Sequence, residues 1–351
     1  MPQGKLKYYK ELDGLRGLAA LTIFFFHFLH GREIKGTLPA FAMKLISFGP
    51  TMANLFFVLS GFLITQILLA AKGSDNYFSR YYAKRVLRIF PLYYLVLLIY
   101  FFGLPLLYHR PLPLWGMQWY NWVHLQNLPL TFKWPHAGPK YLWSLAVEEH
   151  FYLLWPLLVF WCNKRQMIVC STIFFSLALV SRIVLVQYNY PVFYFTLSTM
   201  DALSIGAIAG ILNYHQDLPR YMMHIRIAAI ATGIPAITLW LLYFGTMSNA
   251  FHTLMPVAIN IFYASALCII VQSGDSNPVK RLLTTRLLIF AGTISYGFFI
   301  FHPLCISFTH RLFHNNNTGL QLTISLCMSI IAATASYFLF ERWFIGLKRY
   351  F

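Results

Sequence analysis

The chain has 351 residues, of which 58% are hydrophobic, 18% aromatic and only 11% charged, and its mean hydropathy is +0.60. Soluble domains usually contain about 25% charged residues, so this composition excludes a disordered chain, a coiled coil and an ordinary soluble enzyme. Apolar runs of about 18 to 25 residues recur from end to end, each long enough to cross a hydrocarbon core of about 30 Å. We therefore predict an all-α polytopic transmembrane bundle, because backbone groups in lipid must be satisfied within each segment.

The net charge is +17, from 27 Lys and Arg against 10 Asp and Glu. In a soluble protein this charge would suggest nucleic acid binding. Here the basic residues lie mostly in short segments between apolar runs, where cytoplasmic loops carry them, so we expect membrane lipid and no nucleic acid among the partners. The 5 cysteines form no CxxC pair and no Cys/His zinc spacing, so we expect neither disulfide nor metal.

The apolar runs predict about ten spans in a single integral-membrane domain over residues 1–351. The first run has the basic start of a signal peptide, but it lacks a small-residue cleavage site and contains Arg16 and His27, so we expect it to stay in the mature protein. The predicted spans are 13–30, 47–71, 89–108, 141–162, 166–187, 195–214, 224–244, 252–272, 286–310 and 319–341.

Lys and Arg set the expected orientation of these spans. The segment 72–88 is rich in both residues, whereas 188–194 and 245–251 contain neither. This bias predicts that both termini are cytoplasmic. The largest predicted outer loop, 109–140, is rich in tryptophan and indicates either an interfacial aromatic belt or a platform on which sugar rings stack. Its tryptophans are Trp115, Trp119, Trp122 and Trp134.

Ionisable residues inside membrane spans are costly, so each is a candidate for function. Arg16 and His27 share the first span, 11 residues apart. A helix turns about 100° per residue, so the two side chains project from nearly the same face, about 16 Å apart along the axis. An anion bound at Arg16, near the cytoplasmic mouth, would extend toward His27 near mid-membrane, where an imidazole can accept a proton. The alternative is a snorkelling arginine and a histidine bonded to a carbonyl.

Two further groups of polar residues stand out. Ser144 and Glu148 share a helical face at the start of the fourth span, and Glu149 points about 100° away from Glu148, so only one carboxylate is expected to face a given site. Such a carboxylate orients a histidine, neutralises an arginine or holds helices together as a structural ion pair. The basic residues at 80–88, before Pro91, predict either contact with anionic lipid or a cytoplasmic clamp for phosphate.

Asp201, His302 and Glu341 are further polar residues in or next to apolar runs, and each taken singly is expected to be structural. The sequence contains no P-loop, no GxSxG and no GxGxxG motif. It therefore does not indicate nucleotide hydrolysis, a soluble-type serine hydrolase or a dinucleotide enzyme.

The polar motifs, taken in order, resemble those of the acyltransferase-3 family of membrane O-acyltransferases. The resemblance covers nearly the whole chain, and although each block is weak alone, the ordered set is specific. The blocks are Glu11-Leu-Asp13-Gly-Leu-Arg16-Gly-Leu-Ala-Ala followed by His27, Leu55-Phe-Phe-Val-Leu-Ser60-Gly61-Phe-Leu-Ile, Arg85-Val-Leu-Arg88-Ile-Phe-Pro91-Leu-Tyr93, Trp143-Ser144-Leu-Ala-Val-Glu148-Glu149-His150-Phe-Tyr152-Leu-Leu-Trp-Pro156, Asp201-Ala-Leu-Ser-Ile-Gly206, Ser295-Tyr296 to His302-Pro303, and Glu341-Arg342.

The resemblance implies a ten-helix bundle in the bacterial inner membrane that moves an acyl group, usually acetyl, from cytoplasmic acyl-CoA to a hydroxyl. The acceptor is expected on a cell-surface polysaccharide or its lipid-linked precursor. The motif matches imply that acetyl-CoA meets Arg16, Arg85 and Arg88, and that His27 is catalytic. The remaining matched residues are expected to bind the substrates, and they are Asp13, Trp143, Ser144 and His302.

The expected mechanism has His27 as general base on the acceptor hydroxyl, with Glu148 or Glu149 as its orienting partner; a covalent acyl-histidine stays open. Some family members carry a C-terminal esterase-like domain, and because this chain ends after its last predicted span, we expect it to act alone. Two positions depart from the family pattern. His150 stands where glutamine is usual, and Met200 precedes Asp201 where a basic residue is common, which puts an ion pair of Asp201 in doubt.

Three alternatives stay open. In the first, the protein belongs to the same family but its acceptor is a small lipophilic molecule such as a macrolide. A transporter or flippase would use the same buried charges to relay protons or bind substrate, and would predict paired halves with broken helices. A non-catalytic lipid- or glycan-binding membrane protein would need neither Arg16 nor His27. The modified hydroxyl, the acyl chain length and the oligomeric state cannot be predicted from the sequence.

Overall fold

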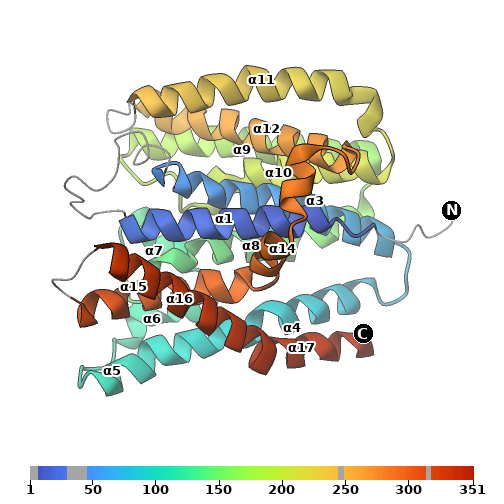
Figure 1. Cartoon of the computed structure of the whole chain (residues 1–351). Helices are drawn as coiled ribbons and strands as arrows, with labels where there is room; N and C mark the ends of the chain where they lie inside the picture. The colour runs from blue at the N-terminus through green and yellow to red at the C-terminus, as the bar shows by residue number, and fades with distance from the viewer. Residues whose placement is uncertain (1–6, 30–45, 244–248, 314–317) are drawn as a thin grey trace.

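The computed structural model describes residues 7–29, 46–243, 249–313 and 318–351, and over these ranges it is a bundle of helices without a strand (Figure 1). The predicted all-α membrane bundle is confirmed. The long helices are α1 (Lys10–Leu29), α3 (Met52–Ala71), α4 (Tyr77–Leu98), α8 (Trp143–Trp161), α9 (Lys164–Gln187), α10 (Thr196–Tyr214), α11 (Leu218–Tyr243), α12 (Asn249–Gln272), α15 (Ser295–Leu312) and α16 (Thr318–Ser336).

Shorter helical segments connect or extend these helices. Several belong to the outer-loop region, where the sequence alone predicts only a loop rich in aromatic residues. The short segments are η1 (Gly49–Thr51), η2 (Ile99–Gly103), α5 (Leu104–Leu107), α6 (Trp115–Trp122), α7 (Asn127–Phe132), η3 (Lys140–Leu142), α13 (Pro278–Leu283), α14 (Arg286–Thr293), η4 (Tyr337–Glu341), α17 (Arg342–Gly346) and η5 (Leu347–Tyr350).

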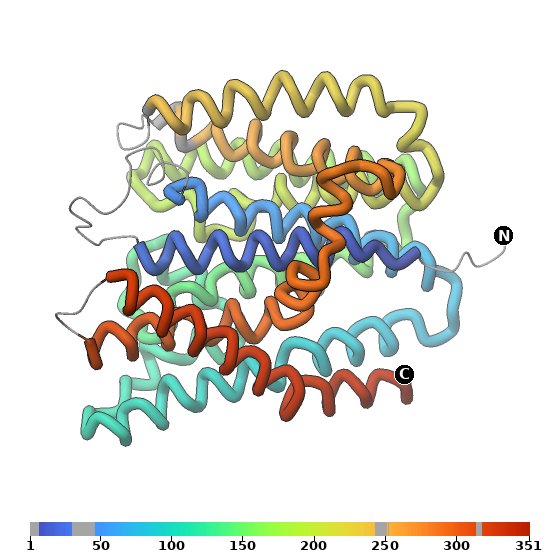
Figure 2. Tube along the Cα trace, viewed as in Figure 1, coloured from blue at the N-terminus to red at the C-terminus, as the bar shows by residue number. Residues whose placement is uncertain are grey.

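Among the described residues, 7 helices are long and apolar enough to cross a membrane, or 8 if the bent pair α14 and α15 forms one span. The two long helices outside this set, α8 and α10, contain Glu148, Glu149 and Asp201, and charged residues lower the hydropathy of a span. The count of ten spans therefore stays a prediction. The start of α1 and the C-terminal η5 lie at the same end of the bundle, and the chain can be followed between them in Figure 2.

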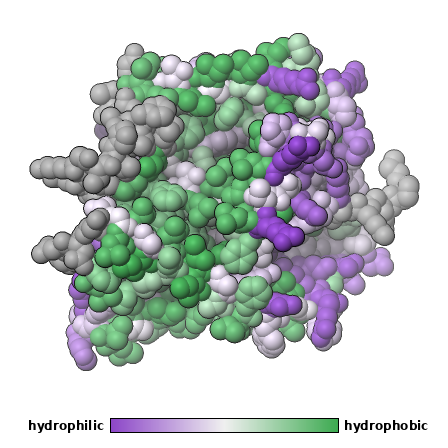
Figure 3. All heavy atoms as spheres, in the orientation of Figure 1, coloured by the Kyte–Doolittle hydropathy of each residue, from purple (hydrophilic) through white to green (hydrophobic). Residues whose placement is uncertain are grey.

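The surface divides into an apolar band and a polar end. Hydrophobic residues cover the middle of the visible face, and hydrophilic residues gather at the end where the chain terminates (Figure 3). Large apolar side chains on peripheral helices are exposed, among them Ile234 at 62%, Ile331 at 67% and Leu339 at 83%. Such a surface would be a liability in water, whereas in a bilayer the same side chains contact lipid.

Two helices depart from the predicted spans in ways that shape the interior. The third span was predicted to begin at residue 89, but α4 begins at Tyr77. The basic residues at 80–88 therefore lie on this helix, and their side chains project from it at helical spacing. The ninth span breaks between α14 and α15, with a bend of 75°. This bend turns the first residues of α15 toward the centre of the bundle, where Ser295 donates a hydrogen bond to the Gly292 carbonyl at 2.7 Å.

Glycine permits the close approach of α3 and α10. A Cβ atom on Gly206 of α10 would lie 2.2 Å from the Val58 carbonyl oxygen of α3, and one on Gly61 would lie 2.0 Å from the Leu203 oxygen. Only a residue without a side chain fits at such a contact. The motif glycines at these positions therefore hold α3 against α10 and fix the wall of the bundle from which Ser60 projects.

Candidate active site

A cavity of about 410 Å³ lies where five helices converge: α1, α3, α4, α8 and α15. Its lining runs along α3 from Ile67 to Ala53, a rise of about 21 Å at 1.5 Å per residue. It reaches Lys7 and Tyr8 at the polar end of the bundle. The polar residues that line it are Lys7, Tyr8, Tyr9, Asp13, Arg16, Ser60, Gln66, Arg85, Arg88, Ser144, Glu148, Tyr152, Ser295 and Tyr296.

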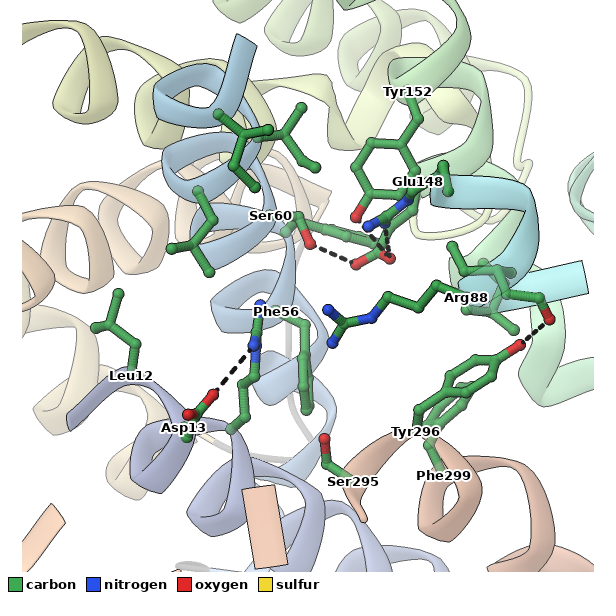
Figure 4. A pocket seen from close by; sticks show the side chains of 18 of the residues that line it. Leu12, Asp13, Phe56, Ser60, Arg88, Glu148, Tyr152, Ser295, Tyr296 and Phe299 are labelled. Atoms are coloured by element: carbon green, nitrogen blue, oxygen red, sulfur yellow. Dashed lines mark hydrogen bonds and ion pairs between the residues drawn. The ribbon is translucent and has the colours of Figure 1, made fainter. Parts of the chain in front are cut away.

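Glu148 is the centre of a hydrogen-bonded group on the cavity wall (Figure 4). Its carboxylate accepts hydrogen bonds from Ser60 at 2.9 Å and from the Tyr152 hydroxyl at 3.0 Å. The Arg85 guanidinium lies 3.9 Å from the same carboxylate and 3.4 Å from the centroid of the Tyr152 ring. This arrangement neutralises the charge of Arg85 and ties α3, α4 and α8 together.

Arg88 lies one helical turn from Arg85 and projects into the middle of the cavity (Figure 4). No carboxylate among the described residues lies within ion-pair distance of it. Arg16, on α1, forms an ion pair with Asp13 at 3.3 Å. A guanidinium that faces a water-accessible cavity without a close carboxylate is suited to bind phosphate or carboxylate groups of a ligand.

Asp13 is shared between Arg16 and the Tyr8 hydroxyl, which donates a short hydrogen bond to it. That bond, together with burial, raises the pKa of Tyr8 to about 12. Of the charged side chains that line the cavity, four are basic and two are acidic. The excess of positive charge favours an anionic ligand that enters from the polar end.

His27 pairs with His302 across the interface of α1 and α15. The Nδ1 atom of His27 lies 2.8 Å from the Nε2 atom of His302, and the two rings are nearly parallel, at 9° and 5.1 Å between centroids. The Nδ1 atom of His302 lies 2.9 Å from the Phe298 carbonyl oxygen. A carbonyl only accepts, so Nδ1 of His302 carries the proton, and Nε2 of a neutral His302 must accept from Nδ1 of His27. In a neutral His27 the basic atom is therefore Nε2.

The cavity ends one turn before this pair. It is lined by Ile23, four residues before His27 on α1, and by Phe299, three residues before His302 on α15. Arg16 and His27 lie on one continuous helix, α1, and His27 belongs to its last described turn. The imidazole pair stands beyond the far end of the cavity that Arg16 lines.

The other sequence-predicted residues separate into two sets. Ser144 lines the same cavity as Glu148, whereas Trp143 lines a second, smaller cavity. Glu149 is not part of the lining of either, in keeping with the predicted divergence of the two carboxylates. The Nδ1 atom of His150 lies 2.7 Å from the Thr196 hydroxyl, on α10.

Asp201 has a basic partner after all. The doubt about its ion pair was wrong, because Arg182 of α9 donates to the Asp201 carboxylate at 2.7 Å and to the Ser198 carbonyl at 3.0 Å. Both side chains are buried. The partner comes from the preceding helix, which the residues next to Asp201 cannot reveal. Sequence reasoning also assigned no role to Ser60 or Tyr152, whose only signal is a polar atom inside a matched motif.

No group of three or more His, Cys, Asp or Glu side chains within the described ranges is suited to hold a metal ion. The cavity and its far end bring together arginines, the partly buried carboxylates of Asp13 and Glu148, and two imidazoles. Such a set binds an anionic ligand and moves a proton.

Comparison with known proteins identifies the family of this chain. A family model described as an acyltransferase domain, of the acyltransferase-3 family, matches residues 9–339. The chain is 28% identical over 328 residues to the peptidoglycan O-acetyltransferase OatA of Listeria monocytogenes. The aligned region covers 86% of this chain and 50% of that protein. It is 26% identical over 363 residues to the putative peptidoglycan O-acetyltransferase YrhL of Bacillus subtilis, covering 96% of this chain and 55% of that protein.

A putative O-acetyltransferase of Staphylococcus aureus is 25% identical over 97% of this chain and 58% of its own length. The chain thus spans about half the length of the curated relatives it matches. No solved structure matches it. Because the family model covers nearly all of the chain, with the matched arginines and Glu148 around one cavity, the protein belongs to the acyltransferase-3 family of membrane O-acyltransferases.

Proposed function

We propose that this protein is an O-acetyltransferase of the bacterial inner membrane that moves an acetyl group from cytoplasmic acetyl-CoA to a hydroxyl of a cell-surface polysaccharide or its lipid-linked precursor. The observation that carries the proposal is the cavity that runs from the polar end of the bundle, past Arg16 and Arg88, to within one turn of His27. The names of the relatives support a glycan acceptor.

The donor half of the proposal rests on charge. The phosphates of acetyl-CoA meet Arg16, Arg88 and Lys7, whose charges exceed those of Asp13 nearby. Arg85 is already neutralised by Glu148, so it acts through the shape of the wall. The uncharged pantetheine arm follows the apolar part of the cavity, along Ile64 and Phe56 toward Ile23. This path brings the thioester toward His27, about 16 Å from Arg16 along the helix.

The acyl half rests on the histidine pair. Nε2 of His27 takes the proton of the acceptor hydroxyl as its oxygen attacks the thioester carbonyl carbon. The tetrahedral intermediate then collapses, the carbon–sulfur bond breaks, and the leaving thiolate receives that proton from His27. His302, which accepts from Nδ1 of His27, takes the orienting role that the sequence suggested for Glu148 or Glu149, because Glu148 is engaged with Ser60, Tyr152 and Arg85.

The test compares His27→Ala with His224→Ala, an exposed histidine on the peripheral helix α11. Both variants, purified in lipid, are expected to bind acetyl-CoA as the unmodified protein does. Since a positioned general base supplies about 10²- to 10⁴-fold, His27→Ala should lose acceptor-dependent thiol release by that factor, and His224→Ala should not. Near-normal turnover of His27→Ala, or no binding of acetyl-CoA by the unmodified protein, contradicts the proposal.

A cellular measurement addresses the product. Surface glycans from cells with and without the gene are compared by mass spectrometry for acetyl-sized increments. Increments that depend on the gene and disappear with His27→Ala support acyl transfer. Movement of a glycan precursor without any thiol release from acetyl-CoA would instead indicate a transporter or flippase.

A further inference from the structure

We infer that a second cavity, at the opposite end of the bundle from the start of α1, is the subsite that receives the face or a substituent of one sugar ring of the acceptor; this inference rests on the proposed function. The cavity measures about 90 Å³. The residues that line it are Pro50, Thr51, Asn54, Trp143, Phe193, Trp240, Phe251, Met255, Pro256 and Ile259.

The lining residues place this cavity at the outer end. Pro50 and Thr51 precede the first residue of α3, whereas Gln66, which lines the first cavity together with Lys7 and Tyr8, lies toward the other end of this helix. Phe193 lies between α9 and α10, and Trp240 lies in the last turn of α11. The acceptor of a surface glycan would approach from this end, while the donor arrives through the first cavity.

The chemistry of the lining fits a carbohydrate. Two indole and two phenyl rings supply apolar faces, against which the C–H face of a pyranose stacks. One amide, Asn54, lines the same space and is held by a hydrogen bond from its Nδ2 atom to the side-chain oxygen Oδ1 of Asn260 at 2.7 Å. The Trp240 indole is also fixed, since its Nε1 atom donates to Ser47 at 3.0 Å. Rigid aromatic walls with one oriented polar group are suited to a ring that carries hydroxyls.

Residues adjacent in the chain line the two cavities. Ala53 lines the first and Asn54 the second, and Ser144 lines the first and Trp143 the second. The Phe57 ring, in the first cavity, meets the Trp143 ring edge-on at 5.9 Å. The donor and acceptor compartments would therefore be adjacent, with the pair Phe57 and Trp143 as the partition.

The second cavity also borders the turn of α1 that carries His27. Its residues Pro50 and Thr51 belong to η1, which contacts α1. A Cβ atom on Gly49, the first residue of η1, would lie 2.3 Å from Cβ of Phe26, the residue before His27. A hydroxyl on a ring held at this cavity is thus on the same side of the bundle as the proposed base.

Size selects among acceptors. A volume of about 90 Å³ is smaller than the roughly 150 Å³ that encloses a benzene molecule in an engineered protein cavity. The enclosed part therefore accepts the face or a substituent of one sugar ring and excludes a macrolide ring. A carbohydrate therefore fits this cavity, whereas a large lipophilic acceptor does not.

The test measures KM for chitopentaose, the probe, with radiolabelled acetyl-CoA and the full chain in lipid nanodiscs. Trp240→Leu and Phe193→Leu are each expected to raise this KM about tenfold, which corresponds to about 1.4 kcal/mol, with no change in KM for acetyl-CoA. Phe193 lies outside the helices and is half exposed, so Phe193→Leu keeps the test valid should Trp240→Leu fold poorly. The matched control is Trp161→Leu, a tryptophan of α8 that is 69% exposed.

Each outcome bears on the inference. A raised KM in both cavity variants and an unchanged KM in Trp161→Leu support it. An unchanged KM in the cavity variants overturns it, and so does a raised KM confined to Trp115→Leu, which would move the acceptor to the outer aromatic loop. Label on erythromycin but not on chitopentaose also overturns it while leaving acyl transfer intact. If acetyl-CoA does not bind at all, the proposed function itself fails.

Discussion

His27 and His302 lie ring to ring, with Nδ1 of His27 2.8 Å from Nε2 of His302. His302 is buried, and its other nitrogen is committed to the Phe298 carbonyl at 2.9 Å. A backbone carbonyl thus sets the tautomer of one imidazole, and that imidazole sets the tautomer of the next. The geometry leaves Nε2 as the basic atom of a neutral His27.

Replacing His302 tests this relay. His302→Leu removes the acceptor for Nδ1 of His27, so the ring loses its orientation, and we expect acetyl transfer to fall about 10- to 100-fold, as for other outer partners of a functional histidine. His302→Gln offers a side-chain oxygen to the same proton and should restore part of the rate. KM for acetyl-CoA should stay constant in both variants. If His302→Leu and His302→Gln lose the same amount of acetyl transfer and both bind acetyl-CoA more weakly, His302 has a role in packing alone.

Arg88→Ala tests the donor site. Removing a guanidinium that faces phosphate should raise KM for acetyl-CoA roughly 10- to 100-fold, because a hydrogen bond to a charged group is worth about 1.5–3 kcal/mol. The salt dependence of binding should weaken with it. Arg80→Ala is the matched control, since Arg80 lies on the same helix but is exposed and donates to the Phe351 carbonyl. Equal KM values for the two variants would remove Arg88 from the donor site.

The buried pair of Arg182 and Asp201 predicts a stability effect. Asp201→Leu leaves the Arg182 charge without its partner inside the bundle, and breaking such a pair usually costs about 3–5 kcal/mol. We expect a clear drop in Tm in detergent. The double replacement Arg182→Leu with Asp201→Leu removes both charges and should recover most of the loss. A double variant no more stable than Asp201→Leu alone would show that the pair is not the source of the effect.

Gly206→Ala tests the contact of α3 with α10. The added methyl group would lie 2.2 Å from the Val58 carbonyl oxygen, and since overpacking usually costs about 1–3 kcal/mol, we expect a lower Tm and a shift of Ser60 away from Glu148. Gly116→Ala is the control, because a Cβ atom there meets nothing within 4 Å. Indistinguishable Tm values would mean that the two helices separate at little cost.

His124 predicts a pH dependence of stability. Burial and, to a smaller extent, proximity to His150 lower the pKa of this imidazole to about 4, whereas the unfolded chain has a pKa near 6.5. Between these values the unfolded state binds more protons, so stability should fall as pH decreases from about 6.5 to 4. His124→Leu should flatten this dependence in unfolding measurements. An unchanged pH profile would mean that His124 charges without cost in the folded protein.

The sequence determines much of this protein by itself. Apolar runs of membrane length dictate helices because lipid cannot satisfy an open backbone, and the helical repeat alone puts Arg16 and His27 on one stripe of α1 and Ser144 with Glu148 on one face of α8. The order of the motifs is enough to indicate the family. These relations are local, since they depend on residues joined by a few turns of one helix.

Only the tertiary structure decides which helices meet. It pairs Glu148 with Ser60 and Arg85, His27 with His302, and Asp201 with Arg182. Each pair joins two helices, and the sequence does not state how these helices are rotated toward one another. It also closes the space between the helices into a basic cavity and an aromatic one. The physical reason is that side-chain periodicity fixes the face a residue occupies, whereas its neighbour depends on how helices rotate and approach, which small contacts such as Gly206 against Val58 determine.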